Sequence, residues 1–198
     1  MTLYISVMGL FGFGKSKEKK DAKYWIKKAQ EEIFKENPNE EKKILYFENA
    51  LNCCNDILKN NPNDSSSLQS KSESLLYLRR YTETIECCDL FLEKKVDHNI
   101  IIFKIIALSE LGRYDDAIKC CDDAIKISSS SDAFRAKATI LEKIGRYDDA
   151  IKCYDDAIKI GTEDDDVWAD KMSALAYVDR YEEAIEWCNQ IIKIGDND

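Results

Sequence analysis

The segment that most closely matches a catalytic motif lies at the start of the chain, where residues 9–16 read GLFGFGKS. These residues satisfy the phosphate-binding loop pattern Gly-x-x-x-x-Gly-Lys-Ser, in which backbone amides would cradle phosphates, Lys15 would reach the terminal phosphates and Ser16 would bind magnesium. Such a loop needs a sheet that holds its amides together, and the residues after position 20 have the pattern of helices. We therefore expect no nucleotide hydrolysis and no cofactor. Nucleotide binding through residues 9–16 stays as an alternative.

The eight cysteines are the second group that could carry chemistry. They recur at intervals of 33 to 35 residues, as Cys53, Cys54, Cys87, Cys88, Cys120, Cys121, Cys153 and Cys188. Adjacent cysteines on a helix point about 100° apart, and cysteines one repeat apart lie too far away for the ~5.5 Å Cα spacing of a disulfide. There is no Cys-x-x-Cys, and His98 is the only histidine, so we expect neither a metal site nor a catalytic nucleophile. Reduced, buried thiols in a cytoplasmic protein fit this pattern.

The elements that must position these residues come from one repeated unit. Residues 112–127 read GRYDDAIKCCDDAIKI and residues 145–160 read GRYDDAIKCYDDAIKI, with one difference, Cys121 against Tyr154. Self-similarity at this period indicates an array of stacked units. The apolar residues of the first copy are spaced to lie on one face of a helix: Tyr114, Ala117, Ile118, Cys121, Ala124 and Ile125.

A second helix is expected before each of these segments. The stripe from Phe134 to Ile144 ends at Gly145, a plausible turn between two helices. The unit is therefore a helical hairpin of 33–34 residues, and it must stack on its neighbours to bury both faces. Aspartate and lysine four residues apart, as in Asp122 and Lys126, predict ion pairs worth ~0.2–0.5 kcal/mol each on the solvent side.

This unit resembles the tetratricopeptide repeat in its archaeal and bacterial forms. The matching residues are Trp168, Tyr181 and Ala184 in one unit and Phe134, Ala138, Tyr147, Ala150 and Ala157 in another. The resemblance implies an all-α, right-handed α-solenoid of stacked helical hairpins over residues 21–198, with about five units at 22–64, 65–97, 98–130, 131–164 and 165–198. It weakens toward the N-terminus, where Thr84 and Phe91 replace two alanines and the first unit needs an insertion around Phe34–Lys42.

In this family the first helices line a concave groove that holds extended peptides or partner helices. The resemblance therefore implies a non-enzymatic interaction scaffold or adaptor with a protein or peptide ligand. Residues 101–111, IIFKIIALSEL, are apolar nearly all round, and core packing needs only Ile101, Ile105, Leu108 and Leu111. We expect the remaining residues and their flanks to line the groove: Leu76, Tyr77, Ile102, Phe103, Ile106, Arg135 and Thr139. Two alternatives are that Ile102 and Phe103 fill the middle of a tightly wound array, or that the apolar N-terminus folds into the groove.

Two further patterns concern the charge of this groove. A lysine recurs in the first helices, as Lys28, Lys71, Lys104, Lys137 and Lys171. It forms either a basic ladder along the groove or a solvated side chain that covers apolar neighbours. Some relatives hold the C-terminal carboxylate of a chaperone with a lysine–asparagine clamp. Residues such as Gln69, Glu73 and Ile102 at the matching places do not form that clamp.

The net charge and the two ends of the chain suggest further partners or exclude them. A net charge of −9 argues against a nucleic-acid surface. We expect residues 1–20 to form a disordered apolar and basic leader, or Met8 rather than Met1 to be the start. The leader is too short to span a bilayer, but a membrane-surface-tethered adaptor is a second alternative. Apolar residues of the last helix, Trp187, Ile191 and Ile192, offer a surface for a homo-oligomer.

Overall fold

The structure, a computed structural model, describes residues 21–160 and 165–195, and it describes the side chains of 21–160 and 166–190. In chain order the helices are α2 (Ala22–Ile33), α3 (Glu40–Asn60), α4 (Ser65–Tyr77), α5 (Tyr81–Leu92), α6 (His98–Glu110), α7 (Tyr114–Ile127), α8 (Ser131–Lys143), α9 (Tyr147–Lys159), α10 (Asp165–Tyr177) and α11 (Tyr181–Gly195). The described residues contain helices and no strand. The expected all-α solenoid of stacked helical hairpins is confirmed.

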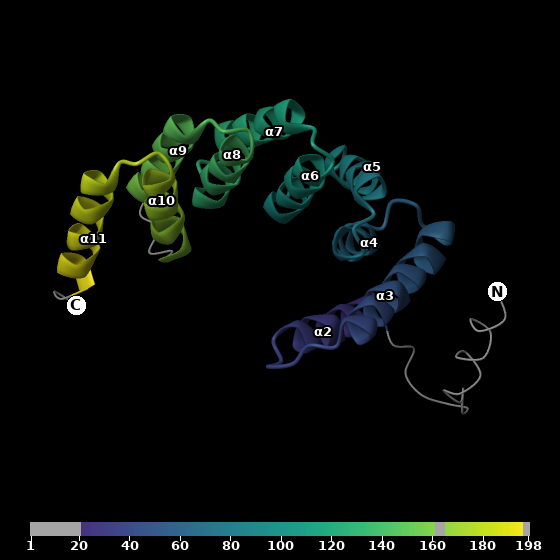
Figure 1. Cartoon of the computed structure of the whole chain (residues 1–198). Helices are drawn as coiled ribbons and strands as arrows, with labels where there is room; N and C mark the ends of the chain where they lie inside the picture. Colours follow the sequence, from purple (N-terminus) through teal and green to yellow (C-terminus); the bar gives the residue numbers. More distant parts are fainter. Residues whose placement is uncertain (1–20, 161–164, 196–198) are drawn as a thin grey trace.

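Each helix packs on the next one along the chain, and first helices also contact each other, as α4 contacts α6 and α6 contacts α8. Figure 1 shows an arc in which α4, α6, α8 and α10 lie along the inner side and α5, α7 and α9 along the outer side. We call the side of α4, α6, α8 and α10 that faces away from the second helices, on the inside of the arc, the concave face. The array therefore presents one continuous surface that is built from the first helix of each hairpin.

The two helices of a hairpin begin in different ways. The first helices α2, α4, α6 and α8 are capped by a side chain that accepts a hydrogen bond from a backbone amide of the first turn, as Asp64 does from Ser67 at 2.8 Å, and α3 of the first hairpin is capped in the same way by Asn39. The second helices α5, α7 and α9 follow an arginine and have no side-chain cap. That arginine instead bonds an acidic residue three positions on, as in Arg80–Glu83 at 2.6 Å and Arg146–Asp149 at 2.6 Å. The GRYDD segments thus encode the start of a helix.

The turn between the two helices of a hairpin needs a left-handed residue. Gly112 and Gly145 have φ of +73° and +78°, and at the same position of other repeats Arg79 and Asp179 have φ of 58° and 59°. The next amide then reaches the carbonyl five residues back, as Arg146 N reaches Leu141 O at 2.8 Å. Glycine adopts this conformation without the strain of a Cβ atom.

Replacing Arg79 with glycine is therefore expected to raise the free energy of unfolding by about 1 kcal/mol, because a left-handed L-residue costs ~1–2 kcal/mol and part of that gain is lost to the more flexible unfolded chain. The Arg79 contacts to Tyr81 and Glu110 are exposed and weak. Urea unfolding followed by circular dichroism measures the difference. The reciprocal Gly145→Ala change should destabilise the chain, and a gain there would contradict this account of the turn.

The core runs along the array as successive clusters, and their composition explains the one difference between the near-identical segments. Cys121 shares a cluster with Ile105 and Ile140, whereas Tyr154, one repeat later, shares one with Ala138 and Ala174. The large residue at position 154 thus faces small neighbours, and the small residue at 121 faces large ones. Such an exchange of large and small residues across an interface is what close packing favours.

The first hairpin differs in length from the others. The expected insertion does not form a long loop, because α2 ends at Ile33 and α3 already begins at Glu40. Phe47, the counterpart of the tyrosine that opens the later second helices, lies about two turns into α3. The added residues therefore lengthen a helix.

Candidate functional site

Helix α6 forms the middle of the concave face, and its apolar residues divide into two groups. Ile101, Ile105 and Leu108 are buried, as expected. Leu111 was expected in the core but is 42 % exposed, because α6 ends at Glu110 and Leu111 caps it; that prediction was wrong. The other group faces the groove.

The groove-facing residues of α6 are not equally accessible. Ile106 is 40 % exposed. Ile102 and Phe103 are half-buried and pack against two neighbouring core clusters. Both therefore have a partly structural role, as one of the sequence-based alternatives held, whereas Ile106 is the apolar residue that the groove leaves open.

Helices α4 and α8 supply the predicted flanks of α6. Leu76 is half-buried against the core, and Tyr77 is 50 % exposed with its ring stacked on Phe47 at 4.5 Å. Arg135 donates to Asp170 at 2.9 Å and pairs with Asp166 at 3.3 Å, both on α10. Thr139 is exposed, and its hydroxyl donates to the Arg135 carbonyl. The structure places all seven predicted residues on contacting first helices, and their binding of a partner stays a prediction.

Two carboxylates that the sequence did not single out lie on the same face. Burial raises the pKa of Glu73, on α4, and the neutral Gln30 amide donates a hydrogen bond to its carboxyl group at 2.9 Å. Burial also raises the pKa of Glu142, on α8, which forms no ion pair with a described lysine or arginine. One sequence signal could have revealed Glu73, because no basic residue lies three or four positions away from it.

Three of the five recurring lysines of the first helices are held in ion pairs with the second helix of the preceding hairpin, whereas Lys28 bonds Glu31 on its own helix. Lys104 bonds Asp89 at 2.6 Å, and the same contact recurs as Lys137–Asp122 at 2.6 Å and Lys171–Asp155 at 2.7 Å. The basic ladder along the groove is therefore not formed by these three lysines. Asp122 is also not the partner of Lys126, which bonds Asp123 at 3.0 Å, three positions away rather than four.

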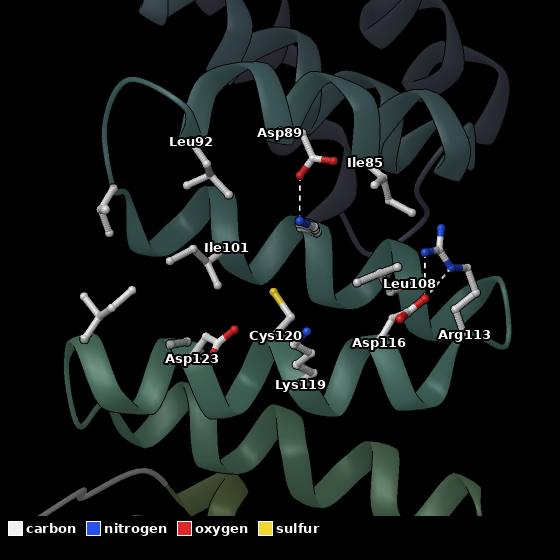
Figure 2. Close-up of a pocket in the computed structure, with 14 residues that line it drawn as sticks. Ile85, Asp89, Leu92, Ile101, Leu108, Arg113, Asp116, Lys119, Cys120 and Asp123 are labelled. Atoms are coloured by element: carbon white, nitrogen blue, oxygen red, sulfur yellow. Dashed lines mark hydrogen bonds and ion pairs between the residues drawn. The ribbon is translucent and has the colours of Figure 1, made fainter.

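A further hollow lies on the other side of the array. A cavity of about 520 Å³ opens between α5 and α7, with Ile101, Lys104 and Leu108 of α6 at its base. Figure 2 shows the Cys120 thiol pointing into it, and the neighbouring charges bonded to each other, as Asp89 to Lys104 and Arg113 to Asp116. Burial raises the pKa of Cys120, which disfavours the reactive thiolate. The cavity therefore offers no activated nucleophile.

Metal and redox chemistry find little support in the described residues. No disulfide joins the cysteines of the described residues. Among the residues that the structure describes, no three of the histidine, cysteine, aspartate and glutamate side chains are grouped to hold a metal ion.

The last hairpin carries the surface predicted for self-association. Trp187 is half-buried, and Lys171 Nζ lies 3.8 Å from the centre of its ring. Ile185 is 61 % exposed, whereas Ile85 and Ile151 at the same repeat position are buried by the following hairpin. The side chains of Ile191 and Ile192 lie outside the described residues.

The predictions made for the N-terminal leader cannot be placed on the fold. Residues 1–20, including the loop motif at 9–16, lie outside the described residues. Within the described part of the chain, no helix is both long and apolar enough to cross a membrane.

Comparison with known proteins agrees with the repeat architecture. Models of the tetratricopeptide repeat match residues 107–131 and 133–167. No curated protein sequence matches the chain.

Several solved structures share the fold. The crystal structure of MamA has a TM-score of 0.67 at 18 % identity, over 77 % of this chain and 90 % of MamA. TTC0263, a thermophilic TPR protein of Thermus thermophilus, has a TM-score of 0.59 at 16 % identity, over 78 % and 89 %. YrrB, described as a TPR protein with an unusual peptide-binding site, has a TM-score of 0.58 at 16 % identity, over 87 % and 93 %. At these identities the likeness establishes the fold alone.

Proposed function

We propose that this chain, a protein built from tetratricopeptide repeats, is a non-enzymatic scaffold or adaptor that holds a peptide or helix of a partner protein on its concave face. The observation that carries the proposal is Ile106, which leaves 40 % of its side chain exposed at the centre of that face, beside half-buried Ile102 and Phe103. Exposed apolar residues in a concave, polar-rimmed setting are typical of binding sites. YrrB, with a similar fold, is described as binding peptide.

The chemistry of the described residues supports a binding role over catalysis. The buried cysteines have raised pKa values. His98, the single histidine, places the same nitrogen, Nε2, 3.1 Å from Asp132 and 3.4 Å from the Ser130 hydroxyl, which also caps α8. A base that activates a serine is held by the carboxylate through its other nitrogen, so this arrangement is not that of a catalytic triad. Free thiols also favour a cytoplasmic location. Self-association through α11 is a separate proposal, supported by exposed Ile185, and sedimentation velocity over a range of concentrations tests it.

The test of the binding role is a single substitution with a matched control. Ile106→Ser is expected to abolish capture of the partner in a pull-down from the source organism, and to leave the melting temperature within about 2 °C, since the residue is partly exposed. Ile127 on α7 is 59 % exposed on the outer side, so Ile127→Ser changes the same chemistry away from the groove.

Equal capture by the two variants would contradict the proposal. Phe103→Ala is a poorer probe because Phe103 packs against a core cluster, and its loss is expected to lower stability as well as binding.

A further inference from the structure

We infer that the concave face selects a cationic apolar peptide, with an apolar side chain seated on Ile102 and Ile106 between two basic side chains that pair with Glu73 and Glu142. This inference rests on the proposed function, because it names the class of ligand for the same groove. It is argued from the charge, burial and partners of the two carboxylates.

Glu73 forms the first subsite. It is half-buried on α4, and its bonded partner, the Gln30 amide at 2.9 Å, leaves the charge uncompensated. The Tyr77 ring lies close enough for Glu73 to raise its pKa, although burial contributes more to that shift. A lysine or arginine here would meet a carboxylate and the exposed aromatic ring together, which is the setting of a cation–π contact.

Glu142 forms the second subsite. It is half-buried on α8, and its neighbour Lys143 is turned away to Glu110, which it bonds at 2.8 Å. The side chain of Tyr154 is fully buried, and its hydroxyl lies close enough to Glu142 to lower the pKa of that carboxyl, although the burial of Glu142 raises its pKa by more. Glu142 thus has a neutral hydroxyl and no cation beside it, as Glu73 has a neutral amide, and a basic side chain of a ligand could compensate its charge.

The other acidic residues near this surface are already neutralised. Asp170 bonds Arg135 at 2.9 Å, and Glu110 bonds Lys143. Among the described carboxylates of α4, α6 and α8, Glu73 and Glu142 are therefore the two without an ion pair, since Asp132 bonds His98. A ligand that ends in a carboxylate would be repelled here, whereas a basic peptide would also be attracted by the net charge of −9.

The spacing of the helices sets the spacing of the basic residues. Helix α4 contacts α6, and α6 contacts α8. Packed helices lie ~8–10 Å apart, so the two carboxylates are separated by about 20 Å, which an extended peptide spans in about six residues. A residue near the middle of that span falls over Ile102 and Ile106 of α6.

The probe is a synthetic fluorescent peptide with two lysines about six residues apart and leucines between them. A second peptide carries glutamine in place of both lysines. Binding to the full chain is followed by fluorescence anisotropy. Glu73→Gln and Glu142→Gln are each expected to weaken the lysine peptide about tenfold, as for loss of a partly desolvated ion pair, and to leave the glutamine peptide unchanged. Glu86→Gln, on the outer face, is the matched control and should bind as the unaltered chain does.

The melting temperatures of Glu73→Gln and Glu142→Gln show whether either variant is still folded. A carboxyl whose pKa is raised in the folded state adds stability below its unfolded pKa, and that stability is lost as the pH rises through the folded pKa. As the pH rises through these raised pKa values, each carboxyl loses its proton although burial favours the neutral form. Glutamine is therefore expected to raise the melting temperature by about 1–2 °C at pH 7, with a smaller gain near pH 4. Weaker binding by a more stable protein cannot come from unfolding.

The outcomes separate this inference from the proposed function. Equal binding of the two peptides, or no binding of the lysine peptide at millimolar concentration, overturns the inference, while loss of partner capture in Ile106→Ser would still support the groove. Concentration-dependent self-association of the full chain that both glutamine variants abolish would identify a second copy as the occupant. Displacement of the probe by a synthetic peptide of residues 1–20, tighter than by unlabelled probe, would identify the chain's own leader. Either result overturns the assignment to a partner.

Discussion

Tyr154→Cys is expected to lower the free energy of unfolding by about 3 kcal/mol, although it makes two segments of the chain identical. The side chain is fully buried, and the change removes an aromatic ring, for which truncations typically cost ~3–5 kcal/mol. Its small neighbours Ala138 and Ala174 cannot fill the space. The value falls at the low end because the lost hydroxyl has no hydrogen-bond partner, so its removal recovers part of a desolvation penalty. Urea unfolding of the full chain measures the difference.

The control for this prediction replaces the lost volume of the Tyr154 side chain by enlarging the residues that lie in the same core cluster. Ala138→Ile and Ala174→Ile reproduce the residues that surround Cys121, so adding them to Tyr154→Cys should recover part of the loss. Introduced alone, the two isoleucines should destabilise the chain by overpacking. Additive effects of all three changes would show that the neighbours of position 154 do not determine its size.

Alkylation of Cys54, Cys88 and Cys121 is expected to be about a thousandfold slower in the folded chain than in urea. Burial raises the pKa of each of these thiols to about 12. An ordinary thiol has a pKa of ~8.5, so at pH 8 the reactive thiolate falls from roughly a quarter of the population to about one part in ten thousand. Peptide mass spectrometry after timed treatment with N-ethylmaleimide measures each rate.

The half-buried cysteines are the internal reference for this experiment. Cys53 and Cys188 are partly exposed and should react sooner in the same folded sample. Modification of all eight thiols at one rate would mean that they react through global unfolding, or that the three buried thiols are accessible. Rapid, selective reaction at Cys121 would instead indicate a reactive thiolate, and would support a catalytic role for this cysteine.

The repeat architecture was predictable because each residue that sets it acts within one hairpin. Tyr147, Ala150 and Ala157 define a helical face by spacing alone, and Gly145 marks the turn that the structure forms with φ of +78°. Arg79 and Asp179 show the limit of that signal, since the same turn forms there without glycine. Packing of the whole hairpin imposes the conformation in spite of the local preference.

The candidate site was only partly predictable because it depends on contacts between hairpins. Repeat spacing separated the buried residues of α6 from Ile106, but it could not show that Phe103 packs against a core cluster of an adjoining hairpin. It also gave no reason to distinguish Glu142 from Glu110. Lys143 is adjacent to Glu142 in the sequence, but in the folded chain it forms its ion pair with Glu110 on α6. Charge compensation across helices is the information that a single sequence lacks.

The ion pairs between successive hairpins bear on how such a chain can grow. Each hairpin from α6 to α9 carries both halves of the contact, a lysine on its first helix, such as Lys104 or Lys137, and an aspartate on its second, such as Asp122 or Asp155. If one such hairpin were duplicated in tandem, the lysine of the new copy would pair with the aspartate of the hairpin before it, and its aspartate would pair with the lysine of the hairpin after it. No residue of the neighbouring hairpins would have to change. Because the lysine always reaches toward the N-terminal neighbour, the contact also has a direction, and a unit can be accepted only head to tail. The near-identity of residues 112–127 and 145–160 fits a recent copying event of this kind.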